Sequence, residues 1–197
     1  TFLRHNELRD ITAELLTEVC PDVMIEPPLQ PLSGECFNYR SANIEDNARA
    51  DIAASGFWSP LHRSFFDIRV YNPFAPTYSK SKLKACHRRN ELEKRRQYDE
   101  RIRVVEHGSF TPLVFTTAGG MGQSAITFYK LLASSISDRL SKPYSTVLNW
   151  IRCRLSFSLL RSAIICLRGA RSSRHRPAFS SAAHMDLAIS EGRLDSN

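Results

Sequence analysis

Two aspartates stand in apolar, strand-like stretches of this sequence, where a charged side chain is unusual. Asp51 belongs to "ARADIAAS", and Asp67 follows 16 residues later in "SFFDIRVYN". The connecting segment contains Gly56 and Pro60, which predicts a hairpin whose strands run side by side, about 5 Å apart. Two carboxylates at that spacing can share a Mg²⁺ or Mn²⁺ ion, because such hard ions prefer oxygen ligands and keep several waters.

An ion held in this way can activate a water molecule and neutralise charge on a phosphodiester during cleavage. Burying a carboxylate without a partner is costly, so we expect a cationic partner for Asp51 and Asp67. That partner is either a metal ion or a plain salt bridge to Arg49 or Arg69, and the sequence leaves both interpretations open.

A basic segment follows the second aspartate. Residues 80–103 contain many Lys and Arg and no Gly or Pro, which predicts a helix. Lys94 lies on it with Tyr98 one turn later on the same face, and a cation there could stabilise charge on a scissile phosphate. The other cations would neutralise DNA phosphates and make binding salt-sensitive, although a solvated helix face is the alternative for each of them. The predicted nucleic-acid-binding set is Lys80, Lys82, Lys84, Arg88, Arg89, Arg95, Arg96 and Tyr98.

Composition limits the other possibilities. The chain has 197 residues, of which 42% are hydrophobic, enough for one compact domain. Residues 1–79 hold 6 basic and 11 acidic side chains, whereas residues 80–197 hold 21 and 9. This asymmetry suits a metal site beside a phosphate-binding surface, although an ordinary basic surface also explains it. The five cysteines form no CxxC, which disfavours a zinc site or disulfide framework, and no apolar run is long enough for a membrane span.

The remaining pattern predicts an α/β fold with a small mixed β-sheet flanked by helices. Helices are expected at residues 4–19, 123–140 and 143–167, with further strands at 22–26 and 110–117. We therefore expect a main domain at residues 1–140, a C-terminal helical extension at 141–168 and a disordered basic tail at 169–197.

Five short motifs occur in a fixed order between residues 4 and 120: "RHNELRDI", "IEPP", "RADI", "FFDIRVYNP" and "EKRRQY". With them the chain resembles the restriction-like endonuclease domain, of the PD-(D/E)xK superfamily, found in site-specific non-LTR retrotransposon proteins. "RADI" stands in place of the proline–aspartate motif, "FFDIRVYNP" in place of the second acid, and "EKRRQY" in place of a helical Lys-and-Tyr motif. The later "FTPLVFTTAGGMG" is similar to the strand and glycine turn that follow. The resemblance implies a restriction-endonuclease-like fold.

The resemblance also implies roles for individual residues. It makes Asp51 and Asp67 metal ligands and Lys94 the catalytic lysine, which would replace the lysine of the short motif where this chain has Arg69. Members of the superfamily often add a glutamate from the first helix. Here Glu7 is preferred because it lies within "RHNE", with Glu14 as the alternative. Next to Glu7, His5 and Asn6 either help to build the site or serve as helix-capping and surface residues.

The function implied is a Mg²⁺- or Mn²⁺-dependent endonuclease that nicks target DNA in the nucleus for retroelement insertion. Its partners would be DNA and a reverse transcriptase domain of the same polyprotein, with no membrane involved. The alternative is a catalytically inactive nucleic-acid-binding module from a decayed retroelement. Both predict salt-sensitive DNA binding, and only the first predicts metal-dependent nicking.

Overall fold

A computed structural model describes residues 2–29 and 49–168, and within them it confirms an α/β fold with a mixed sheet and flanking helices. The chain order is α1 (Phe2–Thr17), β1 (Val23–Ile25), β2 (Ile52–Ser55), β3 (Arg63–Tyr71), the 3₁₀ turn η1 (Pro76–Tyr78), α2 (Leu83–Val104), β4 (Ser109–Thr116), α3 (Gln123–Leu140) and α4 (Tyr144–Arg168).

The described strands form one sheet in the order β1-β2-β3-β4. Strands β1, β2 and β3 pair antiparallel, and the predicted hairpin joins β2 to β3, with Gly56 at a φ of 83° that favours glycine. Strand β4 runs parallel to β3. A parallel pair needs a crossover connection, and α2 supplies it.

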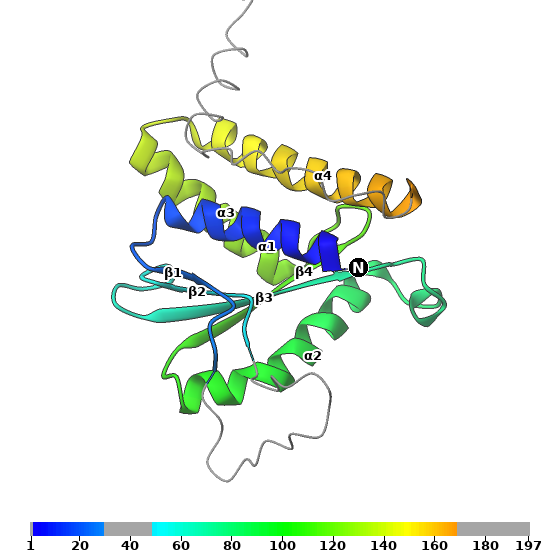
Figure 1. Ribbon diagram of the computed structural model, residues 1–197, viewed down its shortest axis with the longest axis horizontal. Coiled ribbons are helices and arrows are strands. Elements are labelled where there is room, and N and C mark those ends of the chain that lie inside the picture. The colour runs from blue at the N-terminus through cyan, green and yellow to red at the C-terminus, as the bar shows by residue number, and fades with distance from the viewer. Residues whose placement is uncertain (1, 30–48, 169–197) are drawn as a thin grey trace, which may run out of the picture.

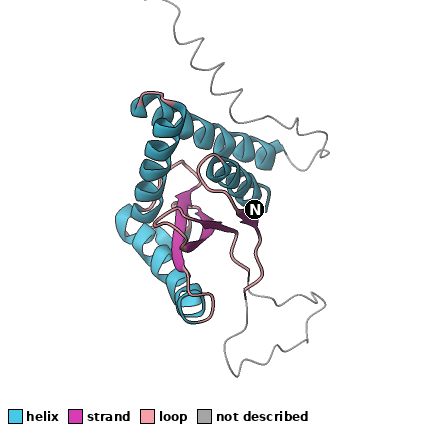
Figure 2. Ribbon diagram, turned by 90° about the vertical axis from the view of Figure 1, so that its left-hand side faces the viewer, coloured by secondary structure: helices cyan, strands magenta, loops and turns pink. Residues whose placement is uncertain are grey.

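Helices cover both faces of the sheet. Figures 1 and 2 show α1, α3 and α4 on one face and α2 on the other. Successive side chains of a strand point to opposite faces, so Phe66 and Ile68 enter the core beneath α1 and α3, whereas Phe65 packs with Tyr98 and Ile102 of α2. The same alternation turns Asp67 toward α2.

Helix α4 shares this core. Val147, Ile151 and Leu155 are fully buried in the same cluster as Leu8 of α1 and Phe66 of β3. The expected extension at residues 141–168 therefore packs as part of the main body. The tail expected at 169–197 lies outside the described residues. No helix in the described part of the chain is long and apolar enough to cross a bilayer.

Candidate active site

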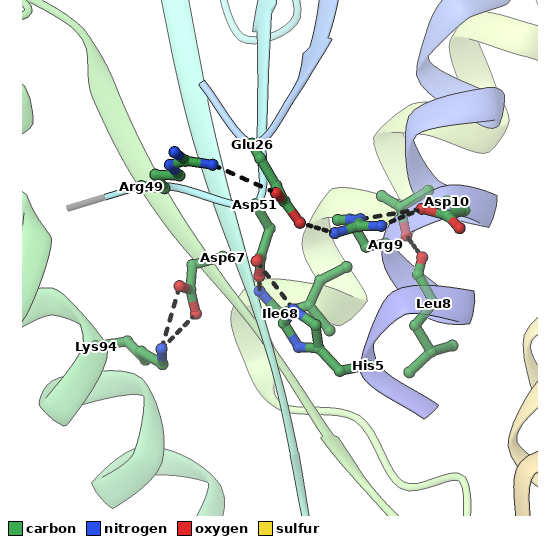
Figure 3. A network of polar contacts seen from close by, with 11 residues as sticks. His5, Leu8, Arg9, Asp10, Glu26, Arg49, Asp51, Asp67, Ile68 and Lys94 are labelled. Atoms are coloured by element: carbon green, nitrogen blue, oxygen red, sulfur yellow. Dashed lines mark hydrogen bonds and ion pairs between the residues drawn. The ribbon is translucent and has the colours of Figure 1, made fainter. Parts of the chain in front are cut away.

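Asp51 and Asp67 meet where β2 and β3 pair. The register sets Ile52 opposite Phe66, and the Asp51 amide donates to the Phe66 carbonyl at 3.1 Å. Asp51 immediately precedes β2, and its Oδ2 accepts the backbone N–H of Ile68, the residue after Asp67, so the two aspartates lie close together. Figure 3 shows the two carboxylates on neighbouring strands, with α1 approaching from one side and α2 from the other. Two like charges placed in this way repel each other and attract a cation.

Lys94 of α2 supplies one positive charge at this point. Its Nζ donates a hydrogen bond to Oδ1 of Asp67 at 3.1 Å and lies 2.9 Å from Oδ2 (Figure 3). The contact with Oδ2 lacks hydrogen-bond geometry, and this buried oxygen accepts no hydrogen bond from any described residue. The lysine also makes a cation–π contact, because its Nζ lies 5.4 Å from the centre of the Tyr98 ring.

The Asp67 carboxyl is buried, with 3% of the residue exposed. Burial and then the charge of Asp51 raise the pKa of Asp67 from 3.8 to about 6, and Lys94 opposes this rise. The ionised form that predominates at neutral pH is thus poorly compensated by the protein, although one ammonium lies beside it. A carboxylate in this state favours the binding of a further cation.

Asp51 is held in place by two donors. Its Oδ2 accepts the backbone N–H of Ile68 at 2.5 Å, and its Oδ1 lies 3.0 Å from Nε2 of His5 on α1. The hydrogen bond to Asp51 raises the pKa of His5, and burial opposes that rise. Of the two interpretations of His5, the structure supports a part in building the site, since the side chain orients one of the two carboxylates.

A cleft of about 530 Å³ opens beside these residues. Its cationic lining contains Arg4 and His5 of α1, Arg69 of β3 and Lys94 of α2, and Glu26 is its acid. The Nε of Arg4 is buried, and no acceptor in the described residues takes its hydrogen. Neither aspartate lines the cleft, but His5, Ile68 and Lys94, which contact their carboxylates, do. A cleft with this charge balance suits a phosphate group.

Salt bridges from Arg49 or Arg69 to the two aspartates were the alternative to a metal ion, and both arginines pair with glutamates. Arg69 pairs with Glu93 of α2 at 2.9 Å, and Arg49 lies 3.8 Å from Glu26. Among the described residues, Asp67 forms its ion pair with Lys94. Lys94 thus reaches Asp67 from the next helix, as the resemblance implies, while Arg69 lines the cleft with its charge partly balanced by Glu93.

The two aspartates fit a divalent ion on chemical grounds. Mg²⁺ in proteins is commonly held by one or two carboxylates while waters and substrate phosphate complete its shell. Asp51 and Asp67 offer that set, and the buried Oδ2 of Asp67 is an acceptor without a hydrogen bond. In residues 2–29 and 49–168 no three His, Cys, Asp or Glu side chains gather as a metal-binding group, so a third protein ligand is not supported.

Glu7 does not join the two aspartates. It is 7% exposed, and its Oε2 accepts hydrogen bonds from Ser158 at 3.2 Å and Ser162 at 2.7 Å on α4. Glu14, the other glutamate considered, pairs with Arg154 of α4. Both glutamates therefore fasten α1 to α4, and the structure corrects the expectation that Glu7 contributes to the site.

Tyr98 also differs from its expected role. Its residue is 8% exposed and its ring packs against Phe110 of β4 at 5.3 Å, so it cannot stack on a nucleic-acid base. Burial, followed by the charges of Asp67 and Asp51, raises its pKa. Tyr98 is better described as a residue that positions Lys94 and Asp67. The remaining predicted cations are exposed or half-buried on or before α2: Lys80, Lys82, Lys84, Arg88, Arg89, Arg95 and Arg96.

Two charged residues of the cleft, Arg4 and Glu26, are not among the residues predicted for the site. They belong to the motifs "RHNELRDI" and "IEPP", and this position is the signal in the sequence that points to them. Glu26 donates its backbone N–H to the Asp51 carbonyl at 2.9 Å, and its carboxylate pairs with Arg9 (Figure 3). These contacts join α1 to the strand end that carries Asp51.

Scans against protein-family models and against curated proteins find no match to this chain. The interpretation of the site therefore rests on its residues and their geometry.

Proposed function

We propose that this chain is a metal-dependent DNA endonuclease that nicks target DNA for insertion of a retroelement. The observation that carries the proposal is the buried Asp67 carboxylate close to Asp51, with the Lys94 ammonium 2.9–3.1 Å away. The motifs that prompted the resemblance lie on successive elements in the same order. A restriction-endonuclease-like fold, a nuclear location and a reverse transcriptase domain as partner belong to the same proposal.

In this proposal Asp51 and Asp67 hold a Mg²⁺ or Mn²⁺ ion. When bound, the ion supplies an activated water and neutralises charge on the phosphodiester. The Ile68 N–H and His5 keep the Asp51 carboxylate oriented. Support of this kind for a metal ligand commonly changes affinity 10- to 100-fold.

Lys94 has two tasks in this scheme. In the free protein it offsets the charge of Asp67, which would otherwise be buried with little compensation. The Lys94 side chain also lines the cleft, where the ammonium can stabilise negative charge that develops on a bound phosphate. The contact with the Tyr98 ring restricts the Lys94 side chain and so lowers the conformational entropy that is lost when the ammonium is fixed near the phosphate.

The substrate class follows from charge. Arg4, Arg69 and Lys94 line the cleft, and residues 80–96, which contain Lys94, carry seven further Lys and Arg side chains. Such a surface attracts a phosphate backbone irrespective of base sequence.

Nicking of supercoiled plasmid in the presence of Mg²⁺ tests the proposal. Wild type should convert the plasmid to open circles, and Asp67→Ala and Lys94→Ala should lower the rate at least about 100-fold. Lys130→Ala is the matched control, because Lys130 is exposed on α3 across the sheet from α2 and should nick like wild type.

Equal nicking by all variants would contradict the assigned site. Salt-sensitive DNA binding by wild type without any nicking would favour the inactive binding module instead.

A further inference from the structure

The loop between β3 and α2 exposes an aromatic side chain beside the basic surface. Phe74 is 81% exposed, more than any other aromatic residue in the described part of the chain. The loop extends outward from the end of the sheet (Figure 1). A single exposed apolar residue needs no explanation by itself, so its surroundings must decide whether it has a role.

The backbone holds Phe74 in a fixed turn. The Asn72 side chain accepts the Phe74 N–H at 3.1 Å, and the Asn72 carbonyl accepts the Ala75 N–H at 3.2 Å. Pro73 and Pro76 restrict the backbone on either side of the ring. A ligand that stacks on Phe74 therefore needs to order little of the loop, which lowers the entropic cost of binding.

The charge around the ring points to one class of ligand. Residues 72–90 contain five Lys and Arg and no Asp or Glu, and Lys80, Lys82 and Lys84 are all exposed. Aromatic side chains combined with a basic track are the means by which proteins stack on nucleic-acid bases, and the stacking is tolerant of sequence.

The position of Phe74 relates it to the cleft. Val70 lines the cleft and precedes Phe74 by four residues, a chain length that spans at most about 14 Å. Successive phosphates of one strand advance about 3.4 Å along the duplex axis, so this reach corresponds to at most about four nucleotides along that axis. A ring at that distance can meet a base close to a phosphate held in the cleft.

We propose that Phe74 stacks on a base of the bound DNA within a few nucleotides of the cleavage position. The inference rests on the proposed function, because it takes DNA as the occupant of the cleft. The ring contributes sequence-tolerant affinity, while the lysines that follow it contact the backbone.

DNA binding without divalent ions tests this inference separately from catalysis. Fluorescence anisotropy with a labelled 30-bp duplex and a 30-nucleotide single strand, in EDTA, measures affinity at several salt concentrations. Phe74→Ala should weaken binding to at least one of the two probes by about 5- to 150-fold, and Phe74→Trp should retain it. The slope of log affinity against log salt should stay at the wild-type value, because no charge is removed.

Leu61→Ala is the matched control. Leu61 is 99% exposed at the hairpin tip, and the nine-residue strand β3 separates it from the loop of Phe74. Wild-type affinity in Phe74→Ala for both probes, or an equal loss in Leu61→Ala, overturns the inference and leaves the nuclease proposal in place. Absence of DNA binding by wild type overturns both, whereas an effect of Phe74→Ala in a protein that does not nick supports the stacking role alone.

Discussion

Asp67 should make the protein less stable as the pH rises toward neutral. Its pKa is 3.8 in an unconstrained chain and about 6 in the folded protein, because burial and Asp51 disfavour the charge. The folded state therefore binds the proton more tightly than the unfolded state. The resulting stabilisation is fully present below about pH 4 and is lost as the pH rises through about 6. A difference of about 2 pKa units corresponds to about 3 kcal/mol in the free energy of unfolding.

Asp67→Asn removes this titration with little change in shape. Urea unfolding followed by circular dichroism, in EDTA, should be measured for wild type and variant at pH 4 and pH 7.5. The unfolding free energy of Asp67→Asn minus that of wild type should rise by about 2–3 kcal/mol between the two pH values. The comparison uses a difference between proteins, so titrations of groups away from Asp67 cancel. His5 is an exception, because the charge of Asp67 helps to raise its pKa.

Asp22→Asn is a control with the opposite sign. Hydrogen bonds from Ser55 lower the pKa of Asp22, so its stabilising contribution is present above the unfolded pKa and is lost on acidification. Asp22→Asn should therefore lose stability relative to wild type as the pH rises. If the unfolding free energy of Asp67→Asn minus that of wild type stays constant or falls between pH 4 and pH 7.5, burial and Asp51 do not raise the pKa of Asp67.

Three further outcomes follow from the contacts of the site. Glu7→Gln should lower the unfolding free energy by about 1–3 kcal/mol, because Ser162 loses a charged acceptor. Plasmid nicking should persist, and loss of nicking in a stable variant would show that Glu7 takes part in catalysis. His5→Ala should weaken Mn²⁺ binding about 10- to 100-fold because Asp51 loses an orienting partner, and unchanged affinity in a Mn²⁺ titration would exclude that role. Arg96→Gln should reduce the salt slope of DNA binding by about 1 if the exposed guanidinium contacts a phosphate, and an unchanged slope would place Arg96 off the DNA path.

Local sequence patterns accounted for much of the fold. The helix predicted at residues 123–140 has the bounds of α3, since Gly122 is extended at its start and Ser141 adopts a left-handed conformation at its end. Helix α2 begins at Leu83, later than the predicted residue 80, because Lys82 is still extended. The parallel pairing of β3 with β4 depends on how α2 packs across the sheet, so no local pattern could specify it.

The sequence predicted the positions of the site residues on the strands better than those on the helices. Alternation along β3 places Asp67 on the face opposite Phe66, and helical spacing correctly places Lys94 and Tyr98 on one face of α2. Whether that face is exposed depends on the sheet beneath it, which is why Tyr98 was expected at the surface. Glu7 takes its partners from α4, 151 and 155 positions away, a separation over which sequence spacing carries no information.

The central claim is that Asp51 and Asp67 bind one divalent ion together. Mn²⁺ titration followed by electron paramagnetic resonance tests it most directly, because bound Mn²⁺ is removed from the free-ion signal whether or not the protein cleaves DNA. Wild type should bind Mn²⁺ saturably, Asp51→Asn and Asp67→Asn should each lose that binding, and Glu14→Gln should retain it, since Glu14 pairs with Arg154 away from the site. Binding that is unchanged in both aspartate variants, or absent from wild type at millimolar Mn²⁺, would contradict the claim.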